Sequence, residues 1–536
     1  MLRFSIATAA AVLLAAPALS QAPKLTSLFA EWRAVQRGEV RDGAPDYRPA
    51  ALARQAEALA RLQRRLAAFD TRGWTTAQKV DRELVRAEMN GLDFDLRVLR
   101  PWQRDPAWYV SIWSAQSDTP AHEGPVHAMP VELWTYRFPL DSAASAKLAR
   151  ELAHIPPLLT QARGNLTGNA RDLWKASVVP IGDQHAALLD LRKRAGADPT
   201  LGRAIDAAAE ATAAFLAWVR AEAPKKTGPS GVGRANYSWF LKNVQLSPLT
   251  WEDEVAILQR ELDRSHAALR LEEHRNRALP PLTGARSPLE YERQATAAVD
   301  SYLRFLDRND LLTVKPYMRP ALMARIGGYV PPAEQNFFHI AMHRAPTTLW
   351  THFYHWWDLA RMAEAPHPSP IRSAPLLYNI WVSRAEGMAT AMEEMMLHAG
   401  LYDEDRRARE IVWIMQAQRA GRGLASLYAH ANMIDLDAAM KMQVARTPNG
   451  WMSPTLPLLG FEQSLYLRMP GYGTSYITGK AAIERLYAEL AEREGERFRT
   501  RQFFDTLDDH GMIPVSMIRW EWLGRTDELR GLGITP

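Results

Sequence analysis

Apolar residues recur every three or four positions along most of this chain, which is the spacing of a helix with one buried face. Residues 53–69 carry Leu59 and Leu62 at this spacing, and the pattern continues over residues 76–99 and 199–222. Proline and glycine separate these segments, as they do between consecutive helices. We therefore predict a mainly α protein with a large helical body.

Two stretches break the helical pattern. Residues 100–140 are rich in proline and tryptophan, which predicts a long aromatic loop region folded against the helices. In residues 328–343 the side chains alternate, with His339 and His343 on one side, and this alternation favours a small β edge strand. An edge strand beside a cleft binds extended substrate, so we expect His339 and His343 to contact substrate.

The strongest candidate for an exposed hinge is residues 225–233, which hold two lysines, a proline and three glycines. A hinge at this place would divide the chain into two regions. The first is an N-terminal helical region over residues 21–230, which includes the proline- and tryptophan-rich loop. A C-terminal helical region over residues 231–536 then carries the motifs discussed below.

The first twenty residues have the pattern of a signal peptide. Arg3 is its basic end, an apolar stretch follows, and Ala18-Leu19-Ser20 is a cleavage site with small residues at both ends. We expect cleavage near Ser20 and a periplasmic or secreted protein. The sequence contains no cysteine, which excludes disulfides, thiolate ligands, a cysteine nucleophile and a lipid-bearing cysteine within it.

Composition excludes two further classes. The formal net charge of +5 is small for 536 residues, and the basic residues are scattered over helix faces, so we expect no nucleic-acid partner. Beyond the signal segment no stretch is long and apolar enough for a membrane span. The sequence contains no indication of the oligomeric state.

A histidine and a later glutamate indicate a metal site. His352 lies in one predicted helix, and Glu386 opens a following one. Helical zinc hydrolases have this layout: a His-Glu-x-x-His run supplies two ligands and a general base, and a downstream glutamate supplies the third ligand. Here the residue after the histidine is Phe353, which cannot accept a proton from water.

Three further segments resemble motifs of one bacterial family. Residues 386–393 read Glu-Gly-Met-Ala-Thr-Ala-Met-Glu, residues 469–479 read Met-Pro-Gly-Tyr-Gly-Thr-Ser-Tyr-Ile-Thr-Gly, and residues 504–514 begin Phe-Asp-Thr-Leu. They are similar to motifs of the "domain of unknown function 885" proteins, exported or lipid-anchored relatives of zincin-type metallopeptidases. The resemblance covers most of the mature chain and implies a zincin-like helical body with a deep cleft.

The resemblance also implies a ligand set, in which this chain departs from the family. The family's His-Glu-x-x-Pro-Gly-His-His run aligns with His352, places Phe353 at the glutamate and places Asp358 at the second histidine. His352, Asp358 and Glu386 are therefore the candidate metal ligands, and His355 replaces Asp358 in a shifted alignment. The cofactor is then either absent or a single divalent metal such as zinc, and an oxygen-rich set favours harder ions.

Further site residues follow from the same motifs. Glu393 is a second partner of the ligands or, together with Glu394, a replacement for the missing general base. Tyr476 resembles a cleft tyrosine that stabilises an oxyanion. His430 matches a family histidine that could reach the cleft, and Tyr472 occupies a glutamine position from which we expect contact with substrate.

A competing arrangement lies in the proline-rich region. Residues 122–127 place His122, Glu123 and His127 in a ligand–base–ligand order, but Pro125 opposes the continuous helical turn that would align such ligands. The alternative for these residues is a loop that lines a surface or cleft.

Three functions remain open from the sequence. The lost glutamate favours a metallopeptidase-like protein with a degenerate site that binds peptides or peptide-like small molecules. The first alternative is an active metal-dependent peptidase or amidase with a re-sited general base. The second is a non-hydrolytic enzyme that uses histidine and tyrosine acid–base pairs in the same cleft.

Overall fold

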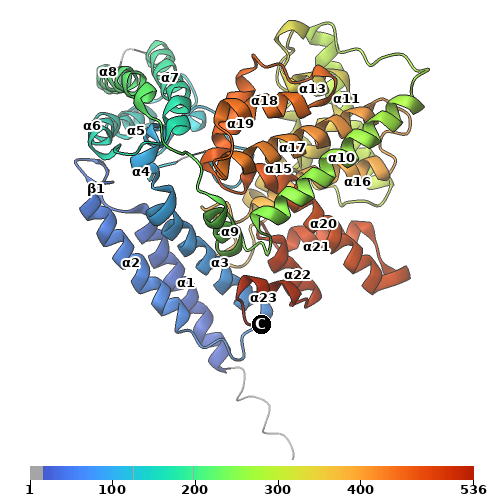
Figure 1. Cartoon of the computed structure of the whole chain (residues 1–536), viewed down its shortest axis with the longest axis horizontal. Coiled ribbons are helices and arrows are strands. Elements are labelled where there is room, and N and C mark those ends of the chain that lie inside the picture. The colour runs from blue at the N-terminus through green and yellow to red at the C-terminus, as the bar shows by residue number, and fades with distance from the viewer. Residues whose placement is uncertain (1–15, 125, 197) are drawn as a thin grey trace, which may run out of the picture.

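The computed structural model describes residues 16–124, 126–196 and 198–536 of the chain. Over these residues the protein is mainly helical, as predicted, and its strands form two small two-stranded sheets (Figure 1). Residues 1–15, which hold most of the predicted signal peptide, lie outside the described part. Among the described helices, none combines the length and apolar character that crossing a membrane requires.

Three N-terminal helices run along one side of the molecule (Figure 1). They are α1 (Ala16–Arg37), α2 (Pro49–Ala67) and α3 (Thr76–Phe94). The predicted face of α2 is buried, including Leu59 and Leu62. A capping box between Thr75 and Gln78 starts α3, and a π-helical turn, Asp95–Leu99, extends it to the predicted end.

A second group of helices follows the first. Its members are α4 (Pro101–Arg104), α5 (Ser142–Leu152), α6 (Ile155–Asn165), α7 (Arg171–Arg194) and α8 (Pro199–Glu222). Strands β1 (Val40–Arg41) and β2 (Ala44–Pro45) pair antiparallel, whereas β3 (Ile112–Trp113) and β4 (Val131–Glu132) pair in parallel. Apart from these short elements, residues 105–140 form the predicted loop region.

The C-terminal body contains the remaining helices. They are α9 (Arg234–Asn243), α10 (Trp251–Arg275), α11 (Pro288–Arg308), α12 (Met318–Met323), α13 (Phe337–Arg344), α14 (Thr347–His352), α15 (Tyr354–Glu364), α16 (Val382–His398), α17 (Ala408–His430), α18 (Leu436–Arg446), α19 (Pro457–Arg468), α20 (Tyr472–Glu494), α21 (Thr500–Asp509), α22 (Val515–Leu523) and α23 (Asp527–Leu532). Helix α16 lies in the interior, with nearly all of its residues buried. This body holds the candidate site.

The buried apolar residues form two main cores. One core joins residues 25–94 of α1–α3 to residues 232–534 of the C-terminal body, and α22 packs against α3. The other core lies mostly within residues 102–223. The three N-terminal helices therefore share their core with the C-terminal body, and the second group of helices forms a separate packing unit.

The predicted edge strand in residues 328–343 is wrong. Residues 337–344 form helix α13, and a capping box between Asn336 and His339 starts it. Phe337 and Ala341 are both buried, at the four-residue spacing of one helix face. Over so short a segment the alternation of side chains does not distinguish a strand from a helix.

Candidate metal centre

A break between two helices brings His352 and His355 together. His352 ends α14, Phe353 leaves helical geometry with φ −70° and ψ 17°, and His355 lies in the first turn of α15. The two imidazole rings face each other edge-on, with centroids 5.0 Å apart. The chain thus brings together two imidazoles that lie three residues apart, across a break between two helices.

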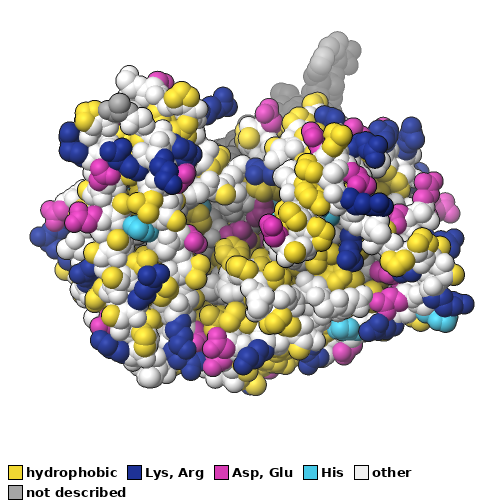
Figure 2. Space-filling view, turned by 90° about the horizontal axis from the view of Figure 1, so that it is seen from above, with side chains coloured by type: hydrophobic (Ala, Val, Ile, Leu, Met, Phe, Trp, Pro, Cys, Tyr) yellow, Lys and Arg dark blue, Asp and Glu magenta, His cyan; other side chains and the backbone are white. Residues whose placement is uncertain are grey.

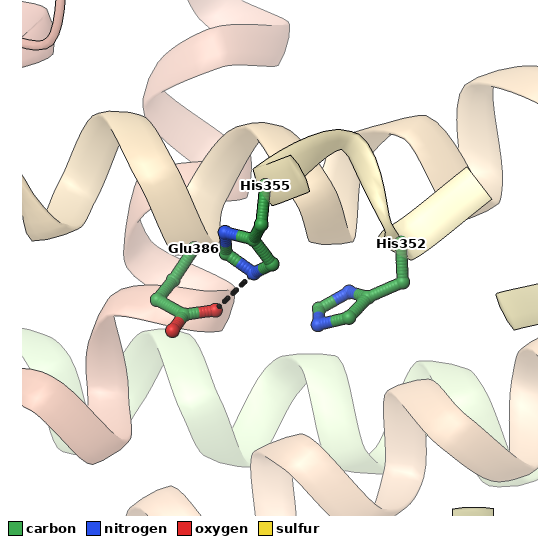
Figure 3. Close-up of side chains that lie close together, drawn as sticks. All are labelled: His352, His355 and Glu386. Atoms are coloured by element: carbon green, nitrogen blue, oxygen red, sulfur yellow. Dashed lines mark ion pairs between the residues drawn. The ribbon is translucent and has the colours of Figure 1, made fainter. Parts of the chain in front are cut away.

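Glu386 of α16 completes the cluster. The potential ligand atoms of His352, His355 and Glu386 all lie within 4.8 Å of one another, and all three side chains are buried. Nε2 of His355 lies 3.0 Å from Oε2 of Glu386 (Figure 3). This is the only such group of three ligating side chains in the described part of the chain.

Close packing of two helices positions Glu386 beside Tyr472. A Cβ atom on Gly387 would lie 2.4 Å from the backbone of Gly479, so α16 and α20 touch at their glycines. The hydroxyl of Tyr472 then donates to Glu386 at 2.6 Å. The glycine of the 386–393 motif therefore permits the contact between Tyr472 and the acid that precedes it.

Tyr472 also connects the cluster to the proline-rich region. Its hydroxyl lies 2.5 Å from Oε1 of Glu123, and burial raises the pKa of Glu123 to about 8. The Tyr472 hydroxyl has one proton and donates it to Glu386. Glu123 is protonated at neutral pH, so it can donate its own proton to the Tyr472 oxygen and complete the second hydrogen bond. Among the described residues of the 122–127 run, Glu123 is the one that contacts Tyr472.

Glu393 lies behind His352. Its Oε1 is 3.0 Å from Nδ1 of His352 and 2.6 Å from Nη2 of Arg419, and Gln416 donates to its other oxygen at 3.2 Å. Burial raises the pKa of Glu393 to about 7 and holds the pKa of His352 well below its usual range. A carboxylate at Nδ1 orients the ring of a ligating histidine and leaves Nε2 for a metal.

The cluster has the unsatisfied polar atoms of a metal site. Both ring nitrogens of His355 and Oε2 of Glu386 are buried and make no well-aligned hydrogen bond to the described residues, although Nε2 and Oε2 lie 3.0 Å apart as an ion pair. Such atoms cost about 1–3 kcal/mol each, and a coordinated cation removes that cost. Two imidazoles and one carboxylate are a ligand set that zinc uses in hydrolases. The residues therefore fit a metal.

The protonation of His355 supports the same interpretation. Burial disfavours its charged form, but the carboxylate of Glu386, with a smaller contribution from Asp118, raises its pKa to about 9. The strongly negative surroundings that hold this proton would equally favour a metal cation at the same nitrogen.

A cavity of about 560 Å³ lies beside the cluster, and His352 forms part of its wall. Figure 2 shows a hollow near the middle of one face, with acidic side chains inside it. The charged side chains that line the cavity are Asp118, Glu123, Arg325, Arg422 and Glu462. Its volume is that of a site for a small organic molecule or short peptide.

Several predicted site residues line this cavity. Tyr476 stacks on His352 with ring centroids 6.2 Å apart, and the guanidinium of Arg422 lies 4.2 Å from the Tyr476 ring. His339 lines the cavity as well. Phe353 is half-buried in the wall and packs edge-on against Trp350.

Other predicted residues lie away from the cavity. His343 is buried, accepts from the backbone N–H of Val330 and stacks on Tyr291. Nε2 of His430 donates to the carbonyl of Tyr466 at 2.9 Å. Neither histidine lines the cavity among the described residues, so their contacts are structural.

Asp358 is not part of the cluster, and His355 occupies the place that the alignment gave to Asp358. The carboxylate of Asp358 lies 3.2 Å from Nη1 of Arg384 and 3.1 Å from Nη2 of Arg361. Arg384 is completely buried and also binds Asp508 at 2.7 Å. A buried guanidinium is stable only with carboxylate partners, so Asp358 serves in a structural ion pair and does not act as a metal ligand.

Two other candidates are engaged elsewhere. Glu394 binds Arg264 and Lys480, which place it outside the cavity lining. His122 contacts Glu132 at 2.6 Å, whereas His127 contacts Ser111 at 2.9 Å, so these two histidines do not share a site.

Sequence reasoning missed Asp118, Arg325 and Arg422. Asp118 comes from a loop far from the motifs in sequence, and no pattern around it indicates a site. Arg422 lies in α17, a helix that is buried along most of its length. Its place in the run Arg-Ala-Gly-Arg-Gly, within this apolar helix, could have indicated a buried arginine with a specific role.

Comparisons with known proteins place this geometry in context. Residues 32–311 and 347–521 match the model of a family described as "Bacterial protein of unknown function (DUF885)". A search of curated proteins finds no match. The matched residues include the cluster and Tyr472.

Two solved structures share the fold. One, from Shewanella oneidensis, is described as "a putative lipoprotein of unknown function"; it has a TM-score of 0.67 and 15% identity, covering 96% of this chain and 100% of that chain. The other, described as "the putative lipoprotein from Colwellia psychrerythraea", has a TM-score of 0.64 and 13% identity, covering 95% of this chain and 98% of that chain.

Proposed function

The chain belongs to the DUF885 family of bacterial proteins, and we propose that it is a metal-dependent hydrolase of peptide or amide bonds. One observation carries the proposal. His352, His355 and Glu386 converge within 4.8 Å, are buried with unsatisfied ligand atoms, and adjoin a cavity of about 560 Å³. This favours the active hydrolase among the functions considered from the sequence.

His352, His355 and Glu386 would hold the metal. When bound, a divalent metal such as zinc polarises a carbonyl group and lowers the pKa of water. Glu393 fixes the ring of His352, and Tyr472 fixes the carboxylate of Glu386. The chain thus supplies both the ligands and the groups that orient them.

Glu123 is our candidate for the re-sited general base. It lines the cavity and contacts Tyr472, which in turn contacts Glu386, so its carboxyl group lies at the side of the cluster that faces substrate. Its raised pKa leaves this carboxyl group protonated at neutral pH, and a metal cation beside it would favour loss of that proton. The carboxylate could then accept a proton from water and return it to a leaving amine. Glu393 and Glu394 are both engaged by buried or half-buried cations.

Tyr476 is the candidate for oxyanion stabilisation. It lines the cavity directly beside His352, and the neighbouring Arg422 adds positive charge at its ring. A phenol at this place can donate a hydrogen bond to a carbonyl oxygen as negative charge develops on it.

Export belongs to the same proposal. The signal-like segment in residues 1–20 predicts it, and the descriptions of the two structural neighbours as lipoproteins support an exported protein. A periplasmic or secreted hydrolase would act on peptides outside the cytoplasm.

The test uses protein purified without chelators and supplied with one equivalent of zinc. We expect it to cleave members of a short fluorogenic peptide library, and we expect chelation or His355→Ala to abolish cleavage. Glu123→Gln should lower kcat about 10²–10⁴-fold and leave the metal content unchanged. Glu39→Gln on the surface is the matched control.

Two results would contradict the hydrolase. Stoichiometric zinc without turnover of any peptide would favour the degenerate, ligand-binding protein. Turnover that survives both chelation and His355→Ala would favour metal-independent acid–base chemistry in the cavity.

A further inference from the structure

Asp118 is a buried acid that the proposed chemistry does not use. It lies in the proline-rich loop and lines the cavity beside the cluster. Its Oδ1 is buried and has no hydrogen-bond partner among the described residues. A buried carboxylate oxygen without a partner is costly to the free protein, and a ligand in the neighbouring cavity could supply that partner.

Two cations, His355 and Arg325, act on Asp118 through their charge without binding it. The guanidinium of Arg325 donates to Gln116 at 2.7 Å and lies 3.3 Å from the centroid of the Trp356 ring, and its Nε has no hydrogen-bond partner among the described residues. His355 pairs with Glu386. Within the described ranges, neither Arg325 nor any other cation forms an ion pair with Asp118.

The other acids at the cavity differ in this respect. Glu462 pairs with Arg422, and Glu386, in the cluster beside the cavity, pairs with His355. Glu123 shares a proton with Tyr472 through their hydrogen bond. Asp118 is therefore the cavity acid that lacks a compensating partner, and a cationic ligand would supply one.

Much of the remaining cavity wall is apolar, although Asn336, His339 and several tyrosines also line it. Leu458, Leu465 and Met342 line it, and Phe461 lies at its margin with 54% of its surface exposed. A ligand that fills this space needs an apolar group next to its charged one.

We propose that Asp118 binds the primary ammonium group of the substrate, and that the substrate carries an apolar side chain beside this group. The inference rests on the proposed function and deepens it. A peptide with a free amino terminus and an apolar first residue has this chemistry. Its terminal peptide bond would then lie toward the metal cluster, because Asp118 and Glu123 line the same cavity as His352.

The test measures binding and does not require turnover. L-leucinol carries an ammonium group and an apolar side chain, and 4-methylpentan-1-ol is its amine-free analogue; neither has a bond that a peptidase cleaves. By calorimetry on zinc-loaded protein, we expect L-leucinol to bind at least about 10-fold more tightly than the alcohol. Asp118→Asn should remove this preference, and the surface variant Asp206→Asn should keep it.

Equal binding of the two compounds, or a preference that survives Asp118→Asn, would overturn the ammonium site. So would a second bound metal per chain that Asp118→Asn removes, because Asp118 would then be a metal ligand. A preference for L-leucinol in protein that cleaves no peptide would instead refute the hydrolase alone. A chain that cleaves N-acetylated and free peptides equally well would refute the ammonium site alone.

Discussion

Replacing Tyr472 with phenylalanine removes one hydroxyl that contacts both Glu386 and Glu123. The ring stays, so the buried packing is retained, but Glu386 loses the donor that holds its carboxylate. Loss of an outer partner of this kind typically weakens metal binding about 10–100-fold. This corresponds to about 1.4–2.7 kcal/mol. We expect Tyr472→Phe to weaken zinc binding by this factor in competition with a chromogenic chelator.

A second buried tyrosine provides the control. Tyr302 is completely buried, and its hydroxyl has no hydrogen-bond partner among the residues described. Tyr302→Phe should therefore leave both zinc affinity and the free energy of unfolding nearly unchanged. If Tyr472→Phe binds zinc as tightly as the wild type while His355→Ala loses it, Glu386 is not oriented by Tyr472 and our account of the centre is wrong.

Three further predictions concern stability. Asp358→Ala should lower the free energy of unfolding by about 3–5 kcal/mol, because the buried Arg384 and Arg361 both lose this carboxylate, yet zinc stoichiometry should not change; a loss of zinc would restore Asp358 as a ligand. Phe353→Ala should cost about 1–2 kcal/mol in urea unfolding, since the ring is half-buried, and a larger loss would show that it closes the cavity. Burial lowers the pKa of His127 from 6.5 to about 3, so the unfolded chain takes up a proton first as the pH falls. Stability should therefore drop below about pH 6.5, by about 2 kcal/mol from His127 alone at pH 5, and His127→Gln should remove that part of the drop.

The helical architecture could be predicted because the apolar spacing is regular. Residues 199–222 form α8 at the predicted bounds, since Asp198 caps the helix and Pro199 suits its first position. Residues 337–344 could not be assigned in the same way. Their side chains alternate and also repeat every four residues, and only the Asn336 capping box decides for the helix.

The candidate site could be predicted only in part. His352, Glu386, Tyr472 and Tyr476 lie in or beside the cluster, and each could be selected from the sequence because it stands in a segment that resembles a family motif. The exchange of Asp358 for His355 depends on a helix break at Phe353, and a straight alignment of motifs assumes an unbroken helix.

The acids of the cavity required the tertiary structure. Asp118 and Glu123 lie more than two hundred residues before the motif that contains Glu386, in a loop without regular spacing. Their position follows from the packing of this loop against the C-terminal body, where the backbone N–H of Gly124 contacts the sulfur of Met469 at 2.9 Å. No periodic pattern along the chain encodes such a contact.

The zinc content of protein purified without chelators tests the central claim most directly. Measured by inductively coupled plasma mass spectrometry, the wild type should hold about one zinc per chain after dialysis against metal-free buffer, as expected for a catalytic set of two imidazoles and one carboxylate. His355→Ala should hold almost none, and Asp358→Asn should hold as much as the wild type. A wild-type protein that retains far less than one zinc per chain, even after reconstitution, would contradict the account.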